Sequence, residues 1–299
     1  MANVAAVKER GAQIAPPARS RPSWSWLGLL PFFLFCTAFL FLPVAFLVVG
    51  SLADNAGDIT LKNYQDLSTG IIPGAFANSI EVSLVTAIAG GLFGFLLAAS
   101  VILGGLPRVL RGALMTFSGV ASNFAGVPLA LAFIFTLGTL GFLTTLLQGI
   151  GLTSFRGVNL TSKLGVEIVY MYFQFPLMVL IIAPALEGLR REWREAAENM
   201  GASAYQYWRH VALPILMPSI LGTMILLFGN SFGAQATAFQ LTGGTLPLVT
   251  LVISSQIRGD VLHNPGLGYA MAMGMVAIMA VSILLYTLLQ RRAERWLRS

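Results

Sequence analysis

Charged residues are scarce in this sequence. Only 10% of its 299 residues are Asp, Glu, Lys or Arg, whereas soluble domains carry roughly 25%. Hydrophobic residues make up 56% of the chain, and its mean hydropathy is +0.78. This composition excludes an ordinary water-soluble domain and indicates that lipid surrounds most of the chain.

Residues of metal, redox and phosphate sites are also nearly missing. A single cysteine, Cys36, excludes a disulfide framework, and the two histidines, His210 and His263, lack the spacing of zinc ligands. None of the three lysines follows a glycine, so the Gly-Lys loop that cradles phosphates is absent. No Ser-His-Asp or paired-carboxylate pattern occurs either. We therefore predict that the chain is not an enzyme and binds no cofactor of its own.

Six apolar segments are each about as long as a helix that crosses a bilayer, which needs about 20 residues. The first has no charge over 23 residues, so it is longer than the apolar part of a cleaved signal peptide. The predicted fold is an all-α polytopic membrane protein whose transmembrane domain covers 27–290, between an N-terminal tail (1–26) and a C-terminal tail (291–299). The predicted spans are 27–49, 80–103, 112–137, 166–186, 216–241 and 268–289.

The third span is ambiguous, because the uncharged stretch 112–155 is long enough for one helix or two. A single crossing places 14 of the 18 basic residues on the cytoplasmic side, as the positive-inside rule requires. We therefore expect 138–155 and 242–267 to be outer connections and both termini to be cytoplasmic. This topology accounts for the isoelectric point of 9.8, so nucleic acid is not an expected partner.

The inner loop 187–214 is unusually long and highly charged. Opposite charges four residues apart favour a helix, and Gly201 is expected to end it before a second helical piece over 205–210. The expected ion pairs are Glu187–Arg191, Arg191–Glu195 and Arg194–Glu198.

Seven residues of this loop follow a defined order. Glu-Ala-Ala is followed after three residues by Gly, after nine more by an aliphatic residue, and after one more by Leu-Pro. This order resembles the EAA signature of the permease subunits of binding-protein-dependent ABC importers, with Val211 where Ile is usual. The matching residues are Glu195, Ala196, Ala197, Gly201, Val211, Leu213 and Pro214.

The resemblance covers nearly all of the chain after residue 27, because the six spans and the place of the loop also match. It implies that the loop forms a coupling helix, which docks on a cytoplasmic ATPase, and that the chain lies in the inner membrane. The implied partners are two ATPase subunits that bind ATP and Mg, a second permease subunit, homologous or identical, and an external substrate-binding protein.

Polar residues inside the predicted spans are candidates for the translocation path, because polar groups at membrane depth usually face protein or water. Hydrogen bonding between packed helices is the alternative, and Gly90/Gly94 and Gly229/Gly233 would permit such close packing. The path candidates are Ser122, Asn123, Asn230, Ser231, Gln235 and Thr237.

The solute is the least determined property. The expected outer segments contain six acidic and four basic residues, and this excess of negative charge favours a polyamine or a similar small cation. The compact form also resembles the permeases for phosphonate, sulfate and ferric iron. An ion-coupled secondary carrier and a membrane subunit without a path remain alternatives from other classes, although neither explains the EAA-like order.

Overall fold

The computed structural model describes residues 28–54, 57–152, 156–258 and 263–298, with only the backbone of 292–298. The predicted tail 1–26 lies outside these residues. The chain divides into two compact units, Met1–Phe46 and Leu47–Ser299. The named elements are all helical, and an isolated β-bridge joins Ala53 to Ile59.

The first unit holds most of one apolar helical stretch, Leu30–Ser51. It consists of α1 (Leu30–Cys36), the π-helical turn η2 (Thr37–Phe41) and α2 (Leu42–Ser51). Pro43 accounts for the wider turn, because a proline ring clashes with the carbonyl group four residues earlier. The amide of Leu42 accordingly donates to the Thr37 carbonyl, five residues back.

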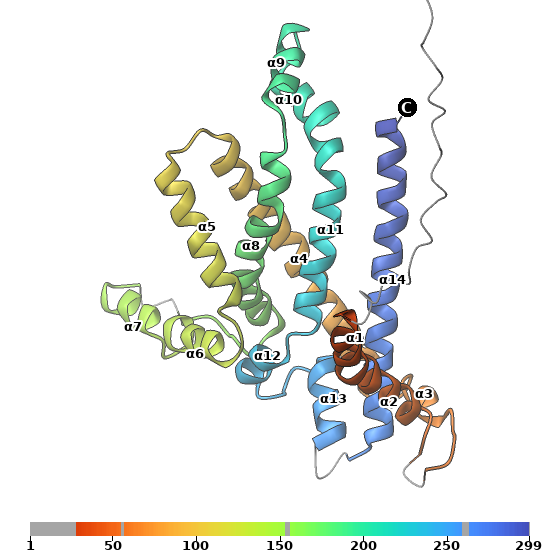
Figure 1. Ribbon diagram of the computed structural model, residues 1–299. Helices are drawn as coiled ribbons and strands as arrows, with labels where there is room; N and C mark the ends of the chain where they lie inside the picture. Colours follow the sequence, from red (N-terminus) through yellow and green to blue (C-terminus); the bar gives the residue numbers. More distant parts are fainter. Residues whose placement is uncertain (1–27, 55–56, 153–155, 259–262, 299) are drawn as a thin grey trace, which may run out of the picture. The chain divides into compact units, whose positions relative to one another are not determined.

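The second unit is built on long helices that pack against α4 and α8 (Figure 1). α4 packs against α8 and α11, α5 packs against α8, and α14 packs against α11 and α13. The helices of this unit are α3 (Lys62–Asp66), α4 (Ile72–Leu103), α5 (Arg108–Asn123), α6 (Gly126–Leu137), α7 (Phe142–Gly149), α8 (Lys163–Glu187), α9 (Arg191–Asn199), α10 (Ala204–Tyr207), η3 (Trp208–Ala212), α11 (Leu213–Phe232), α12 (Gln235–Thr242), α13 (Val249–Arg258) and α14 (Pro265–Arg298).

Six helical stretches of the described chain are long and apolar enough to cross a membrane, which confirms the predicted number of spans. Several of their bounds differ from the prediction, and the fifth stretch begins at Ala204 rather than at residue 216. The second begins at Ile72 rather than residue 80, and the sixth helix continues through most of the predicted C-terminal tail, to Arg298. The six stretches are Leu30–Ser51, Ile72–Leu103, Gly126–Gly149, Lys163–Glu187, Ala204–Phe232 and Pro265–Arg291.

The prediction of one continuous third helix over 112–137 is wrong. The chain leaves the helix at Phe124 and Ala125, and Gly126 has a φ of +74°, a conformation that favours glycine. α6 and α7 lie crosswise to α5 and α8 in Figure 1. The apolar stretch long enough to cross is Gly126–Gly149, so α7 occupies much of what was expected to be an outer connection.

The fifth predicted helix is also interrupted. α11 ends at Phe232, and α12 begins at Gln235 after the residues Gly233 and Ala234. The expected connection 242–267 contains one more helix, α13. Both interruptions leave backbone groups that need partners at membrane depth.

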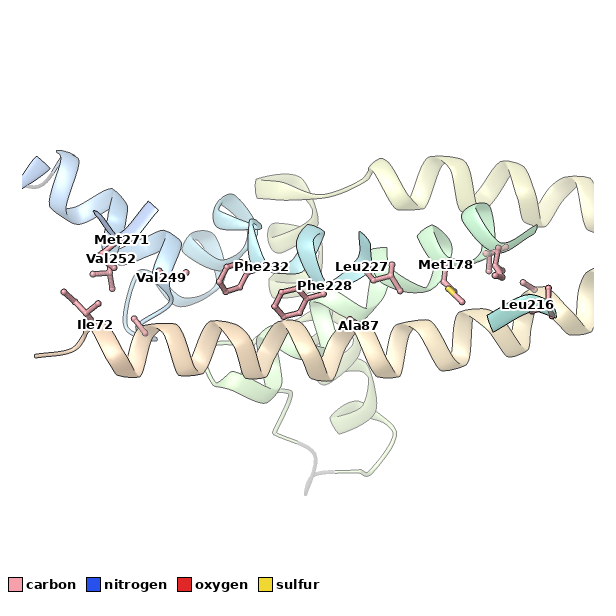
Figure 2. Packing of buried hydrophobic residues seen from close by; sticks show 14 of the residues in the cluster. Ile72, Ala87, Met178, Leu216, Leu227, Phe228, Phe232, Val249, Val252 and Met271 are labelled. Atoms are coloured by element: carbon pink, nitrogen blue, oxygen red, sulfur yellow. The ribbon is translucent and has the colours of Figure 1, made fainter. Parts of the chain in front are cut away.

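Apolar side chains from α4, α8, α11, α13 and α14 form the main core of the second unit (Figure 2). Glycines on α4 let α8 approach closely: a Cβ at Gly90 would lie 2.5 Å from the Gln174 Cβ, and one at Gly94 would lie 2.7 Å from the Met178 Cβ. A second cluster joins α8 to α6, α12 and α13 around Tyr170 and Phe173.

Candidate coupling segment and translocation path

The first four EAA-like residues lie in a helical hairpin, α9–α10, at one end of the second unit (Figure 1). α9 ends because Gly201 takes a φ of +80°, which lets its amide donate to the Glu198 carbonyl at 2.9 Å. α10 begins with a capping box between Ser203 and Gln206. The expected helix, glycine turn and second helical piece are therefore present.

Three residues of the motif anchor the hairpin. Ala197 is 4% exposed and packs with Tyr207 and Ala212 in a small core, which Val211 borders. Trp208 also borders this core, and its ring lies 6.4 Å from that of Phe95 on α4. The third anchoring residue, Gly201, forms the turn. The hairpin is thus attached to a long helix of the main core.

Other residues of the hairpin are exposed. The side chains of Glu195 and Ala196 are exposed, and so is Met200, which is 81% exposed. Glu195 accepts a hydrogen bond from Arg191 at 3.0 Å, and Glu198 accepts one from Arg194 at 2.8 Å. Two of the three expected ion pairs are therefore formed.

The expected pair between Glu187 and Arg191 is wrong, because Glu187 pairs with Arg111 of α5 instead. α8 ends at Glu187, and the chain is extended at Arg190 before α9 begins at Arg191. The two residues are therefore not on one helix, and the four-residue spacing does not bring them together. The pair that does form connects the base of the hairpin to α5.

The last two motif residues lie where the hairpin continues into α11. η3 and α11 form one stretch with α10, and the Leu213 amide donates to the Trp208 carbonyl five residues back. Pro214 explains this wider turn, because it has no amide hydrogen and its ring crowds the preceding turn. Leu213 and Pro214 are half-buried.

The two helix interruptions meet in space. The Gly126 amide donates to the hydroxyl of Thr237 on α12 at 2.8 Å. The hydroxyl of Tyr170 on α8 donates to the Ala234 carbonyl at 2.5 Å. Side chains thus satisfy backbone groups that the interruptions free, and Thr237 is only 2% exposed.

Three of the path candidates next to these interruptions are exposed. Asn123 is the last residue of α5, Asn230 lies in the last turn of α11, and Gln235 begins α12. Ser122 is half-buried and donates to the Gly119 carbonyl at 3.2 Å. Asn123 donates to the same carbonyl at 2.9 Å.

The remaining candidate, Ser231, is 3% exposed and lies in a buried hydrogen-bond network. Its hydroxyl is 2.7 Å from that of Thr86 on α4 and accepts from the Gln174 side chain at 3.1 Å. Gln174 also donates to the Leu227 carbonyl at 2.8 Å. Thr86 and Gln174 had no assigned role from sequence, since a lone polar residue in an apolar span does not show which helix it faces.

Carboxylates of two spans lie near one lysine. Lys163, the first residue of α8, donates to Glu81 of α4 at 2.7 Å. Glu167 follows one turn later on α8 and is half-buried. Glu167 interacts electrostatically with both Glu81 and Lys163, so the cluster of two carboxylates and one ammonium group has a net negative charge when all three are ionised.

Residues 90–295 match the family model of the binding-protein-dependent transport system inner membrane component, so the chain belongs to this family. It is 28% identical over 279 residues to the spermidine/putrescine transport system permease protein PotB of Haemophilus influenzae, covering 91% of this chain and 94% of that one. It is 29% identical over 212 residues to the sulfate transport system permease protein CysT of Salmonella typhimurium, covering 70% and 72%.

Solved structures show the same fold. A chain of a bacterial ABC transporter that imports the acidic polysaccharide alginate superposes with a TM-score of 0.71 at 18% identity, covering 90% of this chain and 95% of that one. A chain of the MetNI methionine ABC transporter gives a TM-score of 0.50 at 15% identity, covering 75% and 99%. The protein is therefore a multi-pass permease subunit of the inner membrane, and ATP hydrolysis belongs to separate subunits.

Proposed function

We propose that this chain forms one half of the translocation path of an ATP-driven importer for a polyamine or a similar small cation. The other half is a second permease, homologous or identical. Two cytoplasmic ATPase subunits hold ATP and Mg, an external binding protein delivers the solute, and both termini of this chain are cytoplasmic. The observation that carries the proposal is the α9–α10 hairpin, whose EAA-like residues divide into an anchored set and an exposed set.

The division suits a docking element. Ala197, Gly201 and Val211 hold the hairpin in shape, and an exposed Ala196 permits close approach of a partner backbone. Glu195 offers a carboxylate to a basic group of that partner. Trp208, directly after α10, contacts Phe95 of α4, and Glu187, shortly before α9, pairs with Arg111 of α5. A displacement of the hairpin therefore reaches the spans through these flanking side chains.

The exposed polar residues support a path beside the helix interruptions. Asn123 and Gln235 lie within three residues of the hydrogen-bonded pair Gly126 and Thr237. Exposed amide side chains and irregular backbone are costly in hydrocarbon, so this face meets water or a second permease rather than lipid. Ser231 and Thr237 support the same path indirectly, by holding the interrupted helices together.

The net negative charge of the cluster at the start of α8 favours a cation as the solute. Glu81 and Glu167 outnumber Lys163 in the cluster at the start of α8, and a spermidine/putrescine permease is among the relatives. Sulfate is the second candidate, because other relatives are sulfate permeases. Phosphonate and ferric iron are the remaining alternatives from the sequence.

The docking role is tested by charge reversal at Glu195, with Glu198 as the matched control. Both residues accept a hydrogen bond from an arginine four residues earlier, and their side chains are 56% and 55% exposed. Glu195→Lys should abolish copurification of the ATPase or its stimulation by the loaded binding protein, whereas Glu198→Lys should retain both. Equal behaviour of the two variants would reject a specific docking role for Glu195.

The solute is tested in proteoliposomes that contain the whole importer and its binding protein. ATP-dependent uptake of radiolabelled spermidine, reduced by Glu167→Gln, is the expected result. ATP-dependent uptake of labelled sulfate instead would contradict the cation assignment while leaving the importer class in place. Uptake that follows an ion gradient without ATP would favour the secondary carrier.

A further inference from the structure

An apolar groove runs along the outside of the second unit, between α4, α11 and α14. Its volume is about 510 Å³. Its floor includes Ala87, which is 2% exposed, and Phe228, which is 8% exposed. Exposed aliphatic side chains form its walls, such as Leu84 on α4 and Val281 and Leu285 on α14.

The groove has the length of one leaflet of a bilayer. On α14 its lining extends from Ala277 to Leu289, a rise of about 18 Å at 1.5 Å per residue. The hydrocarbon core of a bilayer is about 30 Å thick, so one leaflet contributes about 15 Å. Ala277 is near the middle of the candidate span Pro265–Arg291, and Leu289 is near its end. The length of the groove therefore matches one acyl chain.

Positive charge follows directly beyond the end of the groove. Arg291, two residues after Leu289, has an exposed side chain, and Arg292, Arg295 and Arg298 follow in the sequence. Each basic residue near a membrane surface attracts anionic lipid with about 1 kcal/mol. The apolar groove and the exposed Arg291 thus match the two parts of an anionic phospholipid.

We infer that this groove binds one acyl chain of an anionic phospholipid, whose phosphate lies at Arg291. The binding site is distinct from the helix interruptions and from the α9–α10 hairpin. It requires only that the chain lies in a membrane, so it can be tested without any transport measurement.

The groove itself is tested with two alanines of α14. Ala277 lines the groove and Ala280 does not, and both are exposed. The full-length chain in its importer complex is purified in mild detergent, and native mass spectrometry measures binding of added phosphatidylglycerol. Ala277→Trp should weaken binding roughly tenfold, which corresponds to about two methylene groups displaced from the groove. Ala280→Trp should bind as the unaltered protein does. Equal binding by the two variants would overturn the proposal. Ala277→Leu is a smaller substitution that is less prone to misfold, and its lipid affinity should lie between those of the unaltered protein and Ala277→Trp.

The headgroup preference is tested with Arg291 and a control arginine of similar exposure, Arg108 at the start of α5. Arg291→Gln should weaken binding of phosphatidylglycerol about fivefold, whereas Arg108→Gln should not. The unaltered protein should prefer phosphatidylglycerol to phosphatidylcholine. Equal affinity for the two lipids would overturn the anionic assignment. A photo-crosslinker at Val281 that captures the second permease instead of lipid would overturn the site.

Discussion

The hydroxyl groups of Thr86 on α4 and Ser231 on α11 lie 2.7 Å apart in the buried interior of the second unit. Ser231 also accepts a hydrogen bond from Gln174 on α8, so one residue joins three helices. Hydrogen bonds between polar side chains of neighbouring helices are stabilising in an apolar environment, because a buried polar group with an unmet hydrogen bond is costly. We interpret the network as the element that fixes α11 just before its interruption at Gly233.

Removing one hydroxyl should therefore weaken the helix contact. We expect Ser231→Ala to lower the free energy of unfolding by about 1 kcal/mol, because Gln174 and Thr86 both lose a partner. Thr86→Val should cost less, since Ser231 keeps its bond with Gln174. Unfolding of the purified chain in increasing SDS measures both, and the double variant gives a coupling energy of about 0.6 kcal/mol. Strict additivity would show that the two hydroxyls do not interact.

The close contact of α4 with α8 depends on glycine at position 94. A Cβ there would lie 2.7 Å from the Met178 Cβ and 2.8 Å from the Phe175 carbonyl oxygen. Gly94→Ala should thus destabilise the chain by about 1–3 kcal/mol, although alanine favours a helix over glycine by up to about 1 kcal/mol. Gly112→Ala on α5, where nothing lies within 4 Å of the added atom, should be neutral or stabilising. Thermal denaturation in detergent measures both variants, and a shift of the two denaturation temperatures in the same direction would refute this prediction.

The number of spans and the EAA-like hairpin were predictable because they depend on local order. Hydropathy gives the number of spans, and helical charge spacing with one glycine gives α9, its end at Gly201 and α10. The interruptions at 124–125 and 233–234 were not predictable in this way. They lie in uncharged stretches with several glycines, and only tertiary partners, Thr237 for Gly126 and Tyr170 for Ala234, show which ones break the helix.

The same limit applies to side-chain partners. Spacing along the chain predicted Arg191–Glu195 and Arg194–Glu198, which lie on one helix, but could not show that Glu187 faces Arg111, 76 residues away. The role of the polar span residues depends equally on the neighbouring helix. Ser231 and Thr237 are buried in helix contacts, whereas Asn123 and Gln235 are exposed. The residue types alone do not show which of these side chains are buried.

The turn at Gly201 gives a prediction that separates backbone strain from docking. No atom lies within 4 Å of an added Cβ, so an alanine would meet only the strain of the left-handed conformation, about 1–2 kcal/mol. Gly201→Asn should retain most transport, Gly201→Ala less, and Gly201→Pro none, because proline cannot adopt this φ or donate to the Glu198 carbonyl.

Gly105 provides the matched control for this series. It has a φ of +70° in the connection between α4 and α5, again with nothing within 4 Å. Gly105→Ala should carry similar strain yet leave ATP-driven uptake in proteoliposomes nearly unchanged. Normal uptake by Gly201→Pro would show that the hairpin turn has no part in coupling.

The ion pair between Arg111 and Glu187 gives the last prediction, which concerns transmission from the hairpin to the spans. Both side chains are partly exposed, 36% and 50%, so the pair stabilises the fold by less than about 1 kcal/mol. Its position is more informative than its energy, because Glu187 ends α8 directly before the hairpin. Arg111→Glu and Glu187→Arg should each reduce ATP-driven uptake more than they lower the denaturation temperature, since like charges would push α5 away from the base of the hairpin. The double reversal Arg111→Glu/Glu187→Arg restores the attraction and should restore uptake.

The corresponding reversal of Arg194 and Glu198, a pair within one helix, should change uptake little whether single or double. If the double reversal at 111 and 187 is as impaired as the single variants, the pair does not transmit the movement, and contact through Trp208 and Phe95 becomes the remaining connection to test.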